Sequence, residues 1–213
     1  MKTLLEITTS IFSDSGQSSR LAKRFVAAWR QINPDGEVIV RDLTKEPVPH
    51  IDAGRFGALL AKPAERTPEQ QAVVAYSDAL VEELKRADII VLGLPMYNFA
   101  VPSTLKAYFD HIARAGVTFR YTETGTTVGL LTGKKVYVFA ARGGLYGGTA
   151  SDSQTQYLRH FLSFLGLDDV EFVYAEGLAV SDTARQEGIA RAEAQVDRLV
   201  QREAARMCEC GCD

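Results

Sequence analysis

The sequence predicts an α/β fold in which a doubly wound parallel sheet of five strands carries helices on both faces. Short apolar runs typical of strands alternate along the chain with longer segments whose apolar residues recur at helical spacing, five of each. Parallel strands need crossover connections, and these are right-handed almost without exception. With 213 residues, of which 46% are hydrophobic and 24% charged, the chain can bury one core, so we expect a single domain.

The first three elements are predicted to be a strand, a helix and a strand. Leu4–Ile7 is a short apolar run, and apolar residues at helical spacing over 21–32 predict a helix with one buried face. The turn-forming residues Asn33–Gly36 end this helix, and the β-branched run 38–40 predicts the second strand.

The middle of the chain contains the strongest strand signal. Residues 45–66, rich in Pro, Ala and Gly, look like a long connection, and Thr67–Gln70 resembles a helix-capping box with Pro at the first helical position. After that helix, 88–94 is apolar on both alternating faces, as expected of a central strand covered on both sides. A helix over 103–112 and an irregular Gly/Thr-rich segment over 116–132 follow. The last elements are, in chain order, a strand over 135–141, a helix over 157–165 that Gly166 stops, a strand over 170–175 and a helix over 189–200.

Ligands of such sheets bind beyond the carboxyl ends of the strands. The loop 8–19 is rich in hydroxyl side chains and opens a helix. Hydroxyls and free amides at a helix N-terminus suit a phosphate monoester, because the helix dipole favours an anion there. The alternative is that Ser18 or Ser19 only caps the helix.

Two further loops belong to the same predicted edge. Residues 95–99 follow the most buried strand with two aromatic rings, a thioether and an amide, which can pack against a flat ring and bond its polar edge. The alternative is that Met96, Tyr97 and Phe99 pack in the core. In the loop 142–148, Gly143 and Gly144 allow the backbone to approach a ligand closely, a weak signal by itself.

Several other classes of protein are disfavoured. No G-x-G-x-x-G follows the first strand and no G-x-x-x-x-G-K-[ST] occurs, which argues against a dinucleotide Rossmann site and a nucleotide hydrolase. The net charge of −3 is too acidic for a protein that binds nucleic acid by neutralising phosphates. His50, His111 and His160 are scattered over different elements, so we expect no metal site.

The long motifs of the chain closely resemble those of the FMN-dependent NADH-azoreductases, which include NAD(P)H quinone oxidoreductases. The resemblance covers residues 1 to 200 in order. It rests on Ser10, Gly16–Ser18, Pro95–Phe99, Leu105–Asp110, Arg114–Tyr121 and Thr132–Lys135. It implies a flavodoxin-like subunit with strand order 2-1-3-4-5, a homodimer, and non-covalently bound FMN that passes two electrons from NADH or NADPH to quinones and aromatic azo compounds.

The resemblance also assigns residues to the site. The implied cofactor-binding residues are Ser10, Gly16, Gln17 and Ser18 for the phosphate, Pro95, Met96, Tyr97, Asn98 and Phe99 for the isoalloxazine, and Ala141, Arg142, Gly143 and Gly144 for the other ring edge. Gly16 and Ala141 stand where the family often has serine, so each loses a hydroxyl. Phosphate contacts at Gly16 must then come from its backbone N–H.

The flavin would carry the chemistry, so no catalytic protein acid or nucleophile is expected. We assign Phe119, Tyr121 and Phe161 to the substrate pocket, and the segment 116–132, which contains the first two, is available to build it. If one ring face serves both substrates in turn, the cycle is ping-pong. The alternatives are a flavodoxin-type electron carrier that acts with a protein partner, and a partner-binding module without cofactor. The charge of −3 and the extra segment favour the enzyme over the carrier.

The ends of the chain complete the prediction. The start lacks the apolar stretch of a secretory signal, and the longest apolar run, 89–95, is far shorter than the ~20 residues of a membrane span, so we expect a cytoplasmic protein. We expect residues 1–203 to form the single FMN-binding domain and 204–213 to be a flexible tail. This tail holds all the cysteines, Cys208, Cys210 and Cys212, so no disulfide framework organises the fold.

Overall fold

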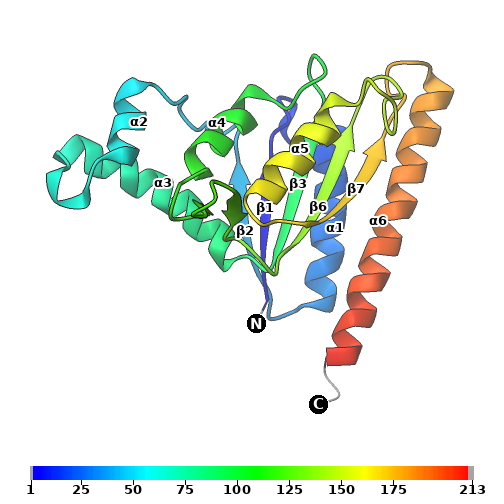
Figure 1. The fold of residues 1–213 in the computed structure, drawn as a ribbon. Helices are drawn as coiled ribbons and strands as arrows, with labels where there is room; N and C mark the ends of the chain where they lie inside the picture. Colours follow the sequence, from blue (N-terminus) through cyan, green and yellow to red (C-terminus); the bar gives the residue numbers. More distant parts are fainter. Residues whose placement is uncertain (1, 211–213) are drawn as a thin grey trace.

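The computed structural model describes residues 2–210 and has a five-stranded parallel sheet at its centre (Figure 1). The strands are β1 (Thr3–Thr8), β2 (Glu37–Asp42), β3 (Ile89–Pro95), β6 (Lys135–Ala141) and β7 (Asp169–Ala175). Their order is β2-β1-β3-β6-β7, with every neighbouring pair parallel. Counted within this sheet, the order is 2-1-3-4-5, which confirms the predicted topology.

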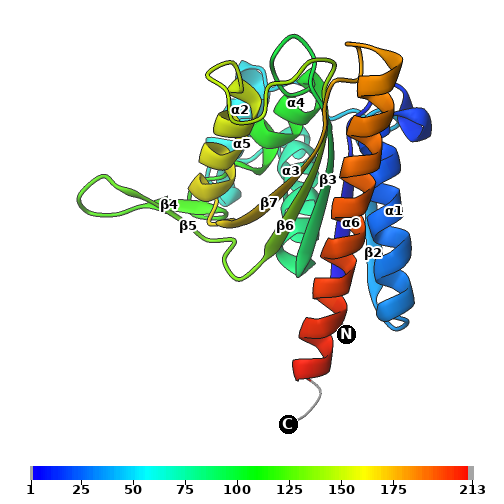
Figure 2. The same ribbon diagram turned by 90° about the vertical axis from the view of Figure 1, so that its right-hand side faces the viewer.

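Helices cover both faces of the sheet (Figure 2). On one face lie α1 (Gln17–Ile32) and α6 (Asp182–Cys210), and on the other lie α3 (Pro68–Arg86), α4 (Ser103–Ile112) and α5 (Ser153–Phe164). Each layer has its own core, because alternate side chains of a strand point to opposite faces. Leu5 and Ile7 of β1 therefore pack with the α3–α5 layer, and Leu4 packs with the α1 layer.

The strongest local signals produced the expected elements. All seven residues of β3 are buried, as expected of a central strand with both faces covered. The capping box that begins α3 is present: the Gln70 amide donates to the Thr67 hydroxyl, and the Thr67 amide donates to the Gln70 side chain. Gly166 follows the end of α5 with a φ of +91°.

Two segments that looked irregular contain secondary structure. Within 45–66, α2 (Ala53–Leu60) begins at Asp52, whose carboxylate accepts from the Arg55 amide at 2.8 Å, and a 3-10 turn, Pro63–Glu65, follows. The segment 116–132 contains the antiparallel pair β4 (Phe119–Tyr121) and β5 (Thr127–Gly129). Figure 2 shows this β4–β5 ribbon projecting from the side of the molecule.

Both segments depend on contacts that sequence periodicity does not report. Gly54 and Gly57 disfavour a helix intrinsically, so the Asp52 cap and the packing of the buried Ala58 outweigh propensity. The ribbon has three residues in each strand and is held by Phe119, whose ring lies 4.2 Å from that of Phe164 on α5.

The last helix is longer than expected. Helix α6 continues to Cys210, so the boundary placed at residue 203 is not a helix end. At this boundary Glu203 is buried and accepts a hydrogen bond from the Tyr137 hydroxyl at 2.5 Å, which fixes this turn to β6. Cys212 lies outside the described residues. None of the described helices is long and apolar enough to cross a membrane.

Candidate functional site

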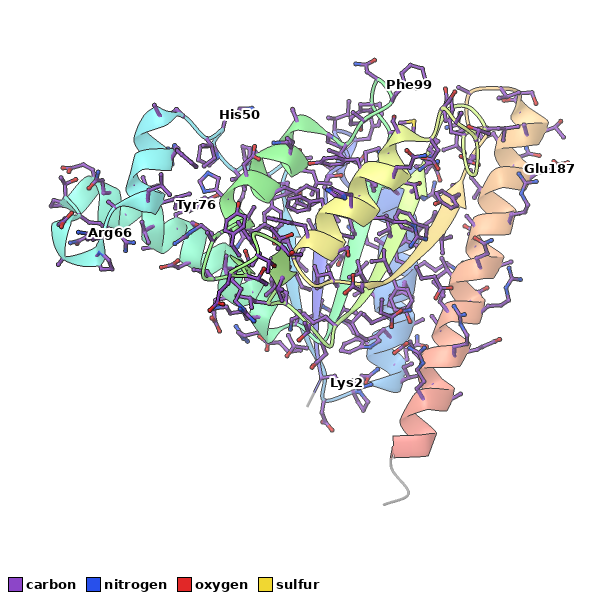
Figure 3. The ribbon with its side chains drawn as sticks, in the orientation of Figure 1. Lys2, His50, Arg66, Tyr76, Phe99 and Glu187 are labelled. Atoms are coloured by element: carbon purple, nitrogen blue, oxygen red, sulfur yellow. The ribbon has the colours of Figure 1, made fainter. Side chains whose placement is uncertain are left out.

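A pocket lies at the carboxyl edge of the sheet, between the loops that follow β1, β3 and β6. Its volume is about 380 Å³. In Figure 3, Phe99 lies at this edge of the molecule and Lys2 at the opposite edge. The pocket therefore occupies the position at which doubly wound sheets bind their ligands, beside the switch point between β1 and β3.

Most of the predicted cofactor residues meet in this pocket. Its lining includes Ser10, Gly16, Gln17, Ser18, Pro95, Met96, Tyr97, Ala141, Arg142 and Gly143. Asn98, Phe99 and Gly144 are not among the lining residues, although Asn98 directly follows Tyr97 and Gly144 directly follows Gly143. The three loops chosen from the sequence thus form one concave site.

One end of the pocket is formed by the start of α1. Gly16 is the residue before this helix, and no side chain caps its first amides. Ser18 and Ser19 are 0% and 1% exposed, and neither hydroxyl has a hydrogen-bond partner in the described structure. Buried hydroxyls normally have a partner, so unpaired ones beside free helix amides suit an anionic ligand that is a hydrogen-bond acceptor.

Glycines permit the close packing at this end. A Cβ on Gly16 would lie 2.2 Å from Oγ of Ser10, and a Cβ on Gly93 of β3 would lie 3.3 Å from the Ser18 carbonyl oxygen. The glycine at position 16 is therefore the residue that leaves room for the Ser10 hydroxyl. Ser10 itself is 2% exposed and accepts from the Phe12 amide at 3.3 Å.

The loop after β3 forms a tight turn. The amides and carbonyls of Tyr97 and Ala100 bond each other at 3.1 and 3.0 Å, and the two central residues, Asn98 and Phe99, have φ values of +49° and +64°. Two positive φ values define a type I′ turn, in which a residue such as Phe is strained. Gln154 of α5 holds the turn, since its Nε2 donates to the Pro95 and Ala100 carbonyls at 3.0 and 3.1 Å.

Arg142, which follows β6, is 1% exposed. Its guanidinium lies 3.0 Å from the Asp152 carboxylate and 3.2 Å from that of Glu176, and it donates to the Thr155 hydroxyl at 2.8 Å. It also lies over the Tyr174 ring, 4.6 Å from its centre. Arg142 thus borders the pocket, but its charge is neutralised by the protein.

The same network orders the loop after β6. Glu176 accepts from the amides of Tyr146 and Gly147 at 2.9 and 2.8 Å, so the carboxylate that pairs with Arg142 also fixes the glycine-rich backbone. Burial alone would raise the pKa of Asp152, but hydrogen bonds from Arg142 and Thr155 outweigh it and hold this pKa below its usual value. Asp152 is therefore favoured as a carboxylate beside Arg142.

The predicted substrate residues do not line this pocket. Phe119 is buried under the β4–β5 ribbon, and Tyr121 is 63% exposed on it. Phe161 of α5 is half-buried, and its ring stacks on that of Phe109 with the centres 4.1 Å apart. Within one chain, these aromatic residues belong to the α4–α5 layer and the β4–β5 ribbon.

Four lining residues were missed as site residues from the sequence. Phe12 and Ser15 belong to the loop after β1, which was identified as a whole. Leu178 and Arg185 come from the connection between β7 and α6 and from the first turns of α6. A fourth loop at the same edge of the sheet was the available signal, because β7 is parallel to the other strands. Within the described part of the chain, no group of acidic, histidine or cysteine side chains is placed to hold a metal ion.

Comparison with protein families gives one match that spans nearly the whole chain. A family described as having the flavodoxin-like fold matches residues 1–200. The parallel sheet order and the position of the pocket are those of this class of α/β protein.

Close relatives narrow the class. An FMN-dependent NADH:quinone oxidoreductase of Cellvibrio japonicus is 57% identical over 200 residues, which cover 94% of this chain and 99% of the relative. A protein of the same description from Alcanivorax borkumensis is 50% identical and covers 91% of this chain and 97% of its own length. The chain therefore belongs to the flavodoxin-like family and, within it, to the FMN-dependent NADH:quinone oxidoreductases.

A solved structure supports the same placement. An FMN-dependent NADH-azoreductase from Bacillus anthracis, in complex with FMN, is 31% identical and superposes with a TM-score of 0.86. The match covers 96% of this chain and 100% of that one. The two backbones are thus closely similar, although fewer than a third of the aligned residues are identical.

Proposed function

We propose that this chain is an FMN-dependent oxidoreductase that transfers two electrons from NADH to quinones and aromatic azo compounds. The single observation that carries the proposal is the pocket at the carboxyl edge of the sheet, which joins the uncapped start of α1 to an end lined by Met96 and Tyr97. The relatives' descriptions name the same cofactor and the same reaction. They give no support to the alternative of a one-electron carrier.

The residues of the pocket fit FMN. The terminal phosphate of FMN needs several hydrogen-bond donors, and the α1 N-terminus offers uncapped amides together with the unpaired Ser18 hydroxyl. The absence of a Cβ at Gly16 keeps space beside Ser10, whose hydroxyl can also donate. These donors would hold the phosphate without any basic side chain from this loop.

The other end of the pocket would hold the flavin ring. Met96, Tyr97 and Ala141 present a thioether, an aromatic ring and a small side chain at adjacent strand ends. Among the described residues, no backbone hydrogen bond uses the amides of Asn98 or Phe99, so these donors are available for the polar edge of a ring. The type I′ turn would fix them in place before the ligand binds.

FMN, when bound, supplies the ability to accept two electrons from a nicotinamide and return them to an organic acceptor. The protein's part is to bind the phosphate, orient the ring and offer amide donors to its polar edge, which stabilises negative charge there. No side chain of the pocket is required as a proton donor or nucleophile. We propose that one ring face serves both substrates in turn, which gives a ping-pong order in which the oxidised nicotinamide leaves before the acceptor enters.

Steady-state kinetics test this function. The flavin-loaded protein is assayed with NADH and NADPH against a quinone and an azo dye, and double-reciprocal plots at several acceptor concentrations should be parallel. Intersecting lines would contradict the ping-pong order. Absence of acceptor reduction by either nicotinamide, with flavin bound, would contradict the enzymatic function and favour the electron carrier.

We further propose that the chain acts as a homodimer in the cytoplasm. Exposed apolar side chains surround the pocket mouth or lie on α2, among them Phe12, Phe56, Leu60 and Phe99, each more than half exposed. Phe99 also lines an adjacent apolar hollow of about 530 Å³ together with Val101 and Tyr157. Large exposed apolar areas on soluble proteins mark interaction surfaces, and two-fold dimers are the commonest oligomers.

A dimer would also reconcile the substrate residues with the structure. Tyr121 and Phe161 do not line the pocket of their own chain, and a second subunit could present them to a substrate there, whereas Phe119 is buried under its own ribbon. Light scattering at micromolar concentration tests the assembly. A mass near twice 23.3 kDa is expected, and a mass of one chain would contradict the proposal.

A further inference from the structure

Arg185 is a cation at the pocket that the structure leaves without a protein partner. It lies in the first turn of α6, is exposed, and lines the pocket together with Ser15, Gly16 and Ser18. Elsewhere on α6, Arg191 pairs with Glu187 at 3.7 Å and Arg206 with Glu203 at 3.1 Å. Within residues 2–210, no carboxylate forms an ion pair with Arg185, although Asp182 lies in the same helical turn.

The position is electrostatically unfavourable for an unpaired cation. The N-terminus of a helix carries about half a positive charge, which repels a cation in the first turn. Figure 2 shows α1 and α6 side by side with their N-terminal ends at the same edge of the sheet. Arg185 therefore lies near two positive helix ends, and an anion between them would relieve both repulsions.

A second observation, independent of the helix ends, points to the same anion. Ser18, which lines the pocket with Arg185, is fully buried and has an unpaired hydroxyl. An anion that accepted from this hydroxyl and from the α1 amides would lie at the end of the pocket that Arg185 borders. The only protein-borne positive side chain in the lining besides Arg185 is that of Arg142, whose charge is already neutralised by two carboxylates.

We propose that Arg185 binds the phosphate of FMN and so makes the pocket select FMN over riboflavin. This inference rests on the proposed function, since it requires that the pocket holds FMN. Arg185 supplies a charge-assisted contact from the β7–α6 side, opposite the neutral donors of the β1–α1 loop. The α6 side of the sheet thereby contributes directly to cofactor affinity.

The test compares two ligands that differ by the phosphate alone. Full-length protein freed of flavin is titrated with FMN and with riboflavin, following quenching of flavin fluorescence, for wild type, Arg185→Gln, Arg185→Lys and Arg198→Gln. Arg198 is the matched control, because it is an exposed arginine of the same helix that does not line this pocket. Thermal unfolding of each flavin-free variant checks that the fold is intact.

Arg185→Gln should weaken FMN binding by about three- to tenfold at low salt and leave riboflavin binding within about twofold. The lysine variant should fall between it and wild type, Arg198→Gln should match wild type, and the loss should shrink as salt is raised. Equal losses for FMN and riboflavin, or no loss, would overturn the proposal. An increase in the NADH KM without a change in FMN affinity would also overturn it, since Arg185 would then bind the nicotinamide's phosphates. If wild type bound neither flavin, the proposed function itself would fail.

Discussion

Two groups of buried polar side chains border the same pocket, and they differ in how their hydrogen-bonding atoms are used. Around Arg142, one guanidinium contacts two carboxylates and a hydroxyl, so its charge is neutralised within the protein. At the start of α1, the buried hydroxyls of Ser18 and Ser19 have no partner in the described structure. We infer that the first group holds the fold together and that Ser18, which lines the pocket whereas Ser19 does not, serves a ligand.

This difference separates two meanings of a polar residue at a site. A buried group that the protein itself pairs costs stability when it is removed, because its partners are left uncompensated. A buried group without a partner costs little stability when it is removed, and its loss appears in ligand affinity. The following substitutions test this separation.

Arg142→Met should have the largest effect. The substitution leaves Asp152 and Glu176 without their shared cation, and removing one partner of a buried ion pair costs about 3 to 5 kcal/mol. Urea denaturation of the flavin-free protein measures this loss, with the exposed Arg120→Gln as a control that should stay within about 0.5 kcal/mol. A loss below about 1 kcal/mol would mean that the Arg142 network does not hold the loop after β6.

Ser18→Ala should lower FMN affinity and leave stability nearly unchanged. The flavin-free stability should change by less than about 0.5 kcal/mol, whereas the FMN dissociation constant should rise about tenfold through loss of one hydrogen bond to a charged group. The matched control is Ser77→Ala, a buried serine that donates to the His111 carbonyl at 2.7 Å and lies outside the pocket. This control should lower stability and leave FMN affinity unchanged. An equal effect of both substitutions on FMN binding would remove the distinction.

Glu6→Gln sharpens the comparison with an unpaired group away from the pocket. Oε1 of Glu6 has no partner, and burial raises the pKa of this carboxyl, an effect that Lys23 and Arg30 partly offset. A raised folded-state pKa means that the favourable contribution is present below the unfolded value of 4.5 and is lost as pH rises through the folded value.

Glutamine cannot ionise, so the variant should match wild type at low pH and become more stable than wild type at high pH. Urea denaturation from pH 4 to pH 8 measures the difference, and FMN affinity should not change. A constant difference across this range would show that Glu6 is not protonated on folding. We thus expect that a proton satisfies the unpaired oxygen of Glu6 and that a bound ligand satisfies the hydroxyl of Ser18.

The sequence identified the parts of the molecule whose signals are local. The doubly apolar run at β3 and the capping box of α3 needed no knowledge of the rest of the chain, and both are present. The three loops of the pocket followed from strand order, because parallel strands bring their carboxyl ends to one edge.

The parts that escaped depend on contacts between distant segments. The β4–β5 ribbon is held against α5, and the turn of α6 at Glu203 is bonded to Tyr137 of β6. The motif Arg142–Gly144 does not predict that Arg142 pairs with carboxylates 10 and 34 residues further along the chain. Arg185 was missed because the fourth loop at the sheet edge contains no motif.

The central claim is that the pocket between the β1, β3 and β6 loops holds one FMN. The direct measurement is to denature the purified protein, identify the released chromophore by mass spectrometry, and then reconstitute wild type and Ser18→Ala in parallel. We expect FMN at one molecule per chain, with weaker rebinding by the variant. Release of FAD, or failure of the flavin-free protein to bind any flavin, would contradict the account.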